Sequence, residues 1–135
     1  MSIRSLGLAG LLLLAGCATA SGTGAGGSEA ALERALDGRV AGQPVDCIRL
    51  GDHLSTEIVE RTAIIWNEGQ TLYVNRTEGG AQALDRSSSL VTRALGQRLC
   101  SGDTINLVDP LSGIPAGVVR LGPFVPYRRS AAAER

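Results

Sequence analysis

The sequence predicts a mainly β domain: a small antiparallel sandwich or open barrel of about six short strands, with one short N-terminal helix. From Pro44 onward, short apolar runs alternate with turn residues, which is the pattern of short strands. Residues 71–75 alternate apolar and polar side chains, as a half-buried strand does. An α+β arrangement is the alternative, because residues 90–94 would suit a helix as well as a strand.

The predicted helix begins at Ser28, whose side chain can cap the first turn. Glu29 then places a negative charge near the positive end of the helix dipole. Apolar residues recur at helical spacing, at Ala31, Leu32, Ala35 and Leu36. Gly38 follows where a helix of this length would end, because glycine readily adopts the left-handed conformation of a C-terminal cap.

Strands or extended segments are predicted at residues 45–50, 61–66, 71–75, 90–94, 97–100, 104–109, 118–121 and 123–127. A four-residue hairpin loop at 67–70 joins the second and third of these segments. A single helical turn is expected at 81–84, and a loop at 110–117. Because aromatic residues make up only 3% of the chain, the core must be built from Leu, Ile, Val and Ala.

The charges of the chain are balanced, with 13 basic and 13 acidic residues among 135. A nucleic-acid-binding surface needs a clustered excess of positive charge. The only adjacent basic pair is Arg128-Arg129, so we expect no nucleic-acid partner.

The N-terminus has the parts of an export signal: Arg4, an apolar run over residues 6–14, and the small residues Ala15 and Gly16. The apolar run is too short to span a bilayer, which needs about 20 residues. The sequence Leu14-Ala15-Gly16-Cys17 resembles the lipobox of bacterial lipoproteins. This resemblance implies cleavage before Cys17 and a lipid on its sulfur. A soluble periplasmic protein, cut at a nearby small-residue site, is the alternative.

The lipobox divides the chain into four parts. Residues 1–16 are the expected signal peptide, 17–27 a lipidated cysteine with a flexible glycine-rich tether, 28–128 one globular domain, and 129–135 a disordered tail. The acylated Cys17 would hold the protein on the bilayer of the cell envelope. Ala18 follows it where lipoproteins retained in the inner membrane often carry aspartate, so the resemblance favours the outer membrane, facing the periplasm.

Two cysteines, Cys47 and Cys100, remain once Cys17 is assigned to the lipid. In an oxidising compartment an even remainder predicts one disulfide, although two buried free thiols are the alternative. Short motifs at 47–48, 73–75, 98–103 and 122–127 resemble those of small proteobacterial envelope proteins without an assigned activity. This resemblance supports the disulfide and the single domain, and it implies no catalytic residue.

No pattern in the sequence predicts an active site, a metal site or a cofactor. His53 is the only histidine, a metal site would need further nitrogen or sulfur ligands, and no G-x-S-x-G motif occurs. The carboxylates that could act in pairs are Glu57 with Glu60 and Asp103 with Asp109, and Asp52 lies beside His53.

Three functions are compatible with these observations. The preferred one is a non-catalytic binding or structural module that acts through a protein partner of the envelope. The alternative is a small envelope hydrolase or carbohydrate-active enzyme that uses an acidic pair or Asp52 with His53. A third is inhibition of an envelope enzyme by an inserting loop such as residues 110–117.

Overall fold

The structure is a computed structural model that describes residues 25–52, 54–92 and 96–131. Within these ranges it has one α-helix, one 3₁₀ turn and ten strands, which confirms the mainly β class with a single N-terminal helix. The helical elements are α1 (Ala25–Ala35) and η1 (Ala81–Ala83). The strands are β1 (Arg39–Ala41), β2 (Cys47–Arg49), β3 (Ser55–Val59), β4 (Ala63–Glu68), β5 (Thr71–Asn75), β6 (Ser89–Thr92), β7 (Arg98–Cys100), β8 (Thr104–Val108), β9 (Pro115–Arg120) and β10 (Phe124–Arg129).

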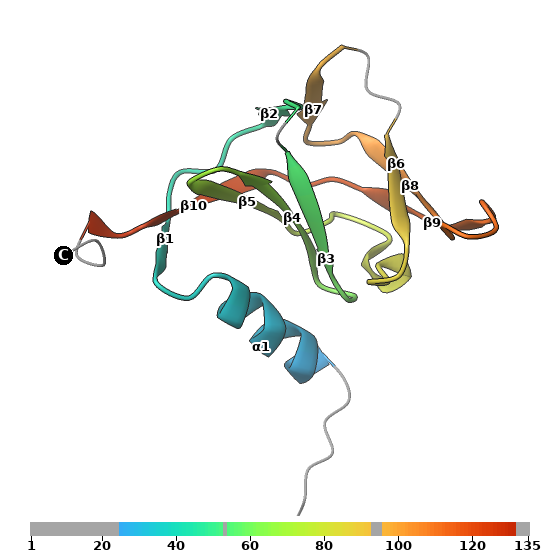
Figure 1. Cartoon of the computed structure of the whole chain (residues 1–135), viewed down its shortest axis with the longest axis horizontal. Helices are drawn as coiled ribbons and strands as arrows, with labels where there is room; N and C mark the ends of the chain where they lie inside the picture. Colours follow the sequence, from blue (N-terminus) through green and yellow to red (C-terminus); the bar gives the residue numbers. More distant parts are fainter. Residues whose placement is uncertain (1–24, 53, 93–95, 132–135) are drawn as a thin grey trace, which may run out of the picture.

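The described strands form three antiparallel sheets that do not close into a barrel. The five-stranded sheet has the order β1-β10-β5-β4-β3, the three-stranded sheet the order β6-β8-β9, and β2 pairs with β7. Helix α1 lies against one face of the five-stranded sheet, and the two smaller sheets lie on the opposite side of that sheet (Figure 1).

Each face of the five-stranded sheet buries its own apolar cluster. Leu32 of α1 packs with the apolar side chains of one face, namely Val59, Ala63, Ile65, Leu72 and Val74. The opposite face contributes Ile58, Ile64, Trp66 and Phe124 to the larger core, which also takes side chains from the two smaller sheets. Trp66 and Phe124 meet edge to face, with ring centroids 5.4 Å apart, so two of the few aromatic residues lie in this core.

Helix α1 begins earlier than the sequence predicts. It starts at Ala25, inside the predicted tether, so Ser28 is not its N-cap. Gly38 follows the helix with φ +70°, which agrees with the predicted ending. Arg76 Nη1 donates to Glu29 Oε2 at 3.0 Å and Arg76 Nη2 donates to Glu29 Oε1, so an exposed ion pair links the first turns of α1 to the residue after β5.

The β4–β5 hairpin is confirmed, but its turn is tighter than the predicted loop at 67–70. Glu68 pairs with Thr71, which leaves only Gly69 and Gln70 in the turn. Gly69 has φ +58° at the first central position, where a type II′ hairpin turn requires glycine. β5 has the bounds that the sequence predicts.

Other boundaries differ from the prediction. β1 and β3 have no predicted counterpart, the expected loop at 110–117 already contains the start of β9, and the expected tail contributes Arg129 to β10. Pro126 explains where β1 ends: its carbonyl accepts from the Gly42 N–H at 2.7 Å, but proline has no N–H to return a bond.

Cys47 and Cys100 form a disulfide across β2 and β7, as the cysteine count predicts. They are directly opposite each other, with 4.0 Å between their Cα atoms. The bonds Ser101 N to Asp46 O and Leu50 N to Gln97 O fall on alternate pairs, so the cysteines occupy a non-hydrogen-bonded pair, where side chains lie closest. The neighbouring pair Ile48–Leu99 turns to the other side, into the larger core.

Candidate interaction surface

The carboxylates proposed as catalytic pairs are not assembled into an active site. Asp103 and Asp109 lie at opposite ends of the five-residue strand β8, and each holds a turn: Asp103 Oδ2 accepts from the Cys100 N–H at 2.7 Å. Glu57 lines a cleft beside α1, whereas Glu60 starts the β3–β4 turn and is not among the lining residues of that cleft. The acidic pairs therefore give the hydrolase alternative no geometric support.

The remaining predicted residues divide between described and undescribed parts of the chain. Asp52 is exposed, and His53 lies outside the described residues, as does Cys17 with the whole predicted signal peptide. Within the described ranges, no three His, Cys, Asp or Glu side chains gather as metal ligands. No helix that the structure describes is both long and apolar enough to cross a bilayer.

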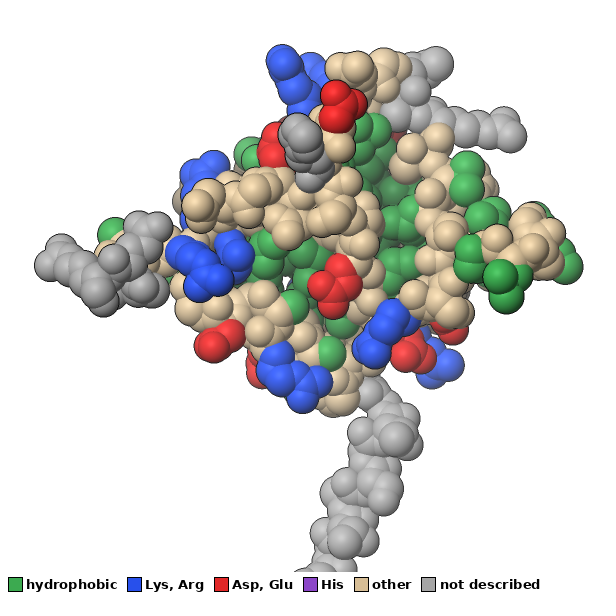
Figure 2. Space-filling model, viewed as in Figure 1, with side chains coloured by type: hydrophobic (Ala, Val, Ile, Leu, Met, Phe, Trp, Pro, Cys, Tyr) green, Lys and Arg blue, Asp and Glu red, His purple; other side chains and the backbone are tan. Residues whose placement is uncertain are grey.

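Among the residues that the structure describes, the most exposed large apolar side chains lie on the β8–β9 hairpin. Leu111 is 97% exposed and Ile114 63% exposed, and both sit in the loop between the two strands, which we call the hairpin tip (residues 109–114). The hairpin projects from one end of the molecule (Figure 1), and apolar side chains cover this end in the space-filling view (Figure 2). Exposed apolar patches, unlike single exposed side chains, mark interaction sites, and here two large apolar side chains share one projecting loop.

Asp109 makes several hydrogen bonds within the hairpin tip. Its Oδ1 accepts from the backbone N–H of Leu111 at 3.0 Å and of Ser112 at 2.8 Å, and from the Ser112 hydroxyl at 2.9 Å. Two backbone bonds close the loop: Asp109 N donates to Ile114 O at 2.9 Å, and Gly113 N donates to Asp109 O at 2.8 Å. Leu111 and Ile114 are thus presented by a loop with internal hydrogen bonds.

The same bonds perturb the titration of Asp109. The Ser112 backbone N–H and then its hydroxyl stabilise the charged carboxylate, which lowers the pKa of Asp109 below its ordinary value. The carboxylate is therefore ionised at neutral pH, and it serves as an acceptor within the loop.

Residues 78–83, which include η1, pack against β9 at the base of the hairpin. Glu78 N donates to Arg120 O at 2.9 Å and Arg120 N to Gly79 O at 3.0 Å, so residues 78–79 run beside the end of β9. Two glycines permit closer packing. A Cβ at Gly80 would lie 2.2 Å from the Val118 carbonyl oxygen, and one at Gly117 would lie 2.5 Å from Ala83 Cβ.

Two further apolar side chains lie on the solvent-facing side of the three-stranded sheet. Val91 of β6 and Val118 of β9 both pair with Asn106 of β8, which places the three residues in one row. Val91 is 42% exposed and Val118 53% exposed. We call the hairpin tip together with Val91 and Val118 the apolar surface.

The apolar surface is suited to binding rather than to chemistry. A loop already held by its own hydrogen bonds loses little conformational entropy when it binds. Burying a leucine or isoleucine side chain is worth about 1.5–3 kcal/mol each, so the two tip residues can contribute about 3–6 kcal/mol before other costs.

The sequence pattern identified the loop at 110–117 but not these two residues. The signal that could have identified them is the pair of aliphatic side chains between Pro110 and Pro115.

The chain matches no protein-family model, no curated protein and no solved structure.

Proposed function

We propose that this protein is a membrane-anchored lipoprotein of the bacterial cell envelope, facing the periplasm, that binds a protein partner without catalysing a reaction. The observation that carries the proposal is the exposure of Leu111 and Ile114 on a hairpin tip that Asp109 holds in place. The lipobox at 14–17 supports the anchor, and the Cys47–Cys100 disulfide suits an oxidising compartment.

The composition of the hairpin favours a protein partner over the bilayer surface. Side chains that settle at a membrane interface are typically Trp and Tyr with Lys or Arg around them. Residues 104–120 contain no aromatic side chain, and their one basic residue, Arg120, pairs with Glu78 at 3.4 Å. Two aliphatic side chains on a narrow tip fit a concave apolar pocket of another protein.

The anchor would strengthen a modest contact. Seven residues separate Cys17 from Ala25, where α1 begins, and a glycine-rich random coil of this length has a root-mean-square reach of about 15 Å. A tip that is confined near the membrane meets a membrane-bound partner at a raised effective concentration. A weak intrinsic affinity is then sufficient for stable association.

The anchor is tested by intact-mass spectrometry of protein extracted from membranes. We expect a mass that begins at Cys17 and carries acyl chains, and we expect Cys17→Ser to move the protein to the soluble fraction. A mature wild-type chain without lipid would overturn the anchor.

The binding surface is tested by purifying the full chain from detergent-solubilised envelopes in three forms. These are the wild type, the double variant Leu111→Ser/Ile114→Ser, and the control Val40→Ser, which removes another exposed valine, on β1. We expect one partner to co-purify with the wild type and the control, and to be lost from the double variant. Recovery of the same proteins from all three, or of none from the wild type, would contradict the proposal.

A further inference from the structure

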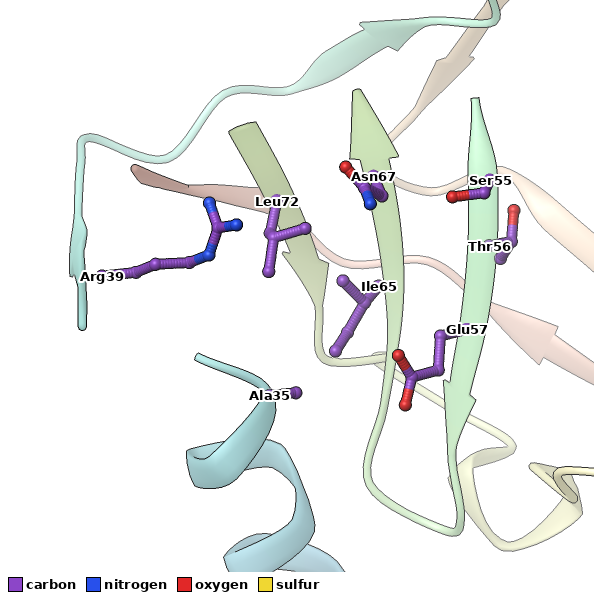
Figure 3. Close-up of a pocket in the computed structure, with 8 residues that line it drawn as sticks. All are labelled: Ala35, Arg39, Ser55, Thr56, Glu57, Ile65, Asn67 and Leu72. Carbon is purple, nitrogen blue, oxygen red and sulfur yellow. The ribbon is translucent and has the colours of Figure 1, made fainter. Parts of the chain in front are cut away.

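A second site lies on the face of the five-stranded sheet that α1 covers only in part. Beyond the C-terminal end of the helix, a cleft of about 400 Å³ opens over β3, β4 and β5. Its floor is apolar and its rim is polar (Figure 3). The lining residues are Ala35, Arg39, Ser55, Thr56, Glu57, Ile65, Asn67 and Leu72.

The strand register places opposite charges on the two sides of this cleft. Glu57 of β3 pairs with Ile65, whose side chain belongs to the cluster beneath α1, so both point to the helix side of the sheet. Arg39 comes from β1 at the far edge, and its guanidinium ends beside Leu72, on the opposite side of the cleft from Glu57 (Figure 3). Arg129, which pairs with Arg39, adds a second positive charge on that side.

The polar groups of the rim are available to a ligand. Arg39 Nη1 donates to the Gln70 carbonyl at 2.9 Å, which fixes the guanidinium beside the β4–β5 turn and leaves its other nitrogens free. Among the described residues, Glu57, Ser55 and Asn67 have no side-chain hydrogen bond or ion pair. An unpaired carboxylate and a guanidinium with free nitrogens thus lie on opposite sides of the cleft (Figure 3).

Sheet geometry gives the separation of the two charges. The guanidinium sits by Gln70 at the start of β5, and Glu57 is two strands away, level with Val74. Across the sheet, the two charges are two strand spacings of about 4.8 Å apart. Along the strand, Val74 is four residues from Gln70 and two from Leu72, and each residue rises about 3.4 Å. The diagonal is therefore about 12–17 Å. Subtracting a hydrogen bond of about 3 Å at each end leaves about 6–11 Å.

We infer that this cleft binds a short zwitterionic peptide of two or three residues, with its carboxylate on Arg39 and its ammonium group on Glu57. An extended chain spans at most about 3.3–3.6 Å per residue, so two or three residues bridge the charges and a free amino acid does not. The middle of the peptide would lie over Ile65 and Leu72, of which only 2% and 8% are exposed, so its charged ends supply most of the recognition. The free Asn67 amide can hydrogen-bond to the peptide backbone, as peptide groups require when they leave water.

Calorimetry on the full chain tests this inference with the tripeptide alanyl-leucyl-alanine as the probe. We expect saturable binding of the free tripeptide. N-acetylation and C-amidation should each lower the affinity about tenfold, and free leucine should bind more weakly than either blocked peptide. These comparisons use the wild-type protein, so they do not depend on whether a variant folds.

Variants then assign each end of the peptide. We expect Glu57→Gln to weaken binding of the free tripeptide and to abolish the effect of acetylation, and Arg39→Gln to abolish the effect of amidation. Glu60→Gln and Arg49→Gln, both at exposed positions outside the cleft, are the matched controls and should bind as the wild type does. Absence of saturable binding, or equal affinity for free and blocked peptides, would overturn the inference. The double variant Leu111→Ser/Ile114→Ser should bind the peptide normally, so the two proposals fail separately.

Discussion

The side chain of Asn75 is hydrogen-bonded twice to the backbone of Gly122, 47 residues further along the chain. Its Nδ2 donates to the Gly122 carbonyl at 2.6 Å, and its Oδ1 accepts from the Gly122 N–H at 3.0 Å. Asn75 is fully buried, the one polar residue in the described core. These two bonds connect the last residue of β5 to the segment that precedes β10. Glycine is required at position 122 because a Cβ there would lie 2.6 Å from the Arg76 carbonyl oxygen.

Asn75→Ala should lower the free energy of unfolding by about 2–4 kcal/mol, because it leaves a buried N–H and a buried carbonyl without partners. Chemical denaturation measures this loss. Asn67→Ala, which removes an exposed asparagine side chain from the neighbouring strand, should change stability by less than about 0.5 kcal/mol. Equal effects of the two substitutions would show that the Asn75 bonds contribute no stability.

Reduction of the Cys47–Cys100 disulfide should destabilise the domain by about 4 kcal/mol in the chain-entropy model, because the bond closes a loop across a sequence separation of 53. Urea unfolding with and without reductant measures the difference. The variant Cys47→Ala/Cys100→Ala should reproduce the reduced wild type and should not respond to reductant. An unchanged midpoint on reduction would contradict this prediction.

Gly80→Ala should destabilise the protein by at least about 3 kcal/mol. The position has φ +79°, which costs alanine about 1–2 kcal/mol, and the new Cβ would collide with the Val118 carbonyl oxygen. Gly113 is a matched control, since its φ is +70° but a Cβ added there would have no neighbour within 4 Å. Gly113→Ala should therefore cost only about 1–2 kcal/mol in thermal or chemical unfolding. Equal losses would mean that the collision is relieved by movement of β9.

Acid should loosen the hairpin tip only below the ordinary pKa of an aspartate. The folded-state pKa of Asp109 is depressed, so its contribution is complete above about pH 3.8 and is lost as the pH falls through the folded pKa. The Ser112 amide resonance, followed by NMR, should titrate with a midpoint below 3.8 and should not titrate in Asp109→Asn. A midpoint at or above 3.8 in the wild type would contradict the hydrogen-bonding role of the carboxylate.

The local signals of the chain were sufficient for some elements. β5 could be bounded from its alternation and the preceding Gly69-Gln70 turn, and the disulfide from the two cysteines that remain once Cys17 is assigned to the lipid. β3 could not be predicted, because it is an edge strand whose first three residues are exposed and whose buried residues, Ile58 and Val59, come only at its end. β1 has three residues, and its pairing depends on β10, about 90 residues away.

The candidate sites depended on these same elements. The hairpin tip follows from a predicted loop, although the exposure of Leu111 is known only once β8 and β9 are paired. The cleft joins Arg39 of β1 to Glu57 of β3, the two strands that lack a sequence signal. Tertiary pairing brings these residues together, so no local pattern could predict the cleft.

Site-specific photo-cross-linking in intact cells tests the proposed function most directly. A photoreactive side chain replaces Leu111 in one variant and Val40, exposed on β1, in the other. We predict a protein adduct of one discrete mass from position 111, none from position 40, and a weaker adduct from position 111 when Cys17→Ser removes the anchor. Adducts to lipid alone from position 111, or the same protein adducts from both positions, would contradict a lipoprotein that binds its partner through the hairpin tip.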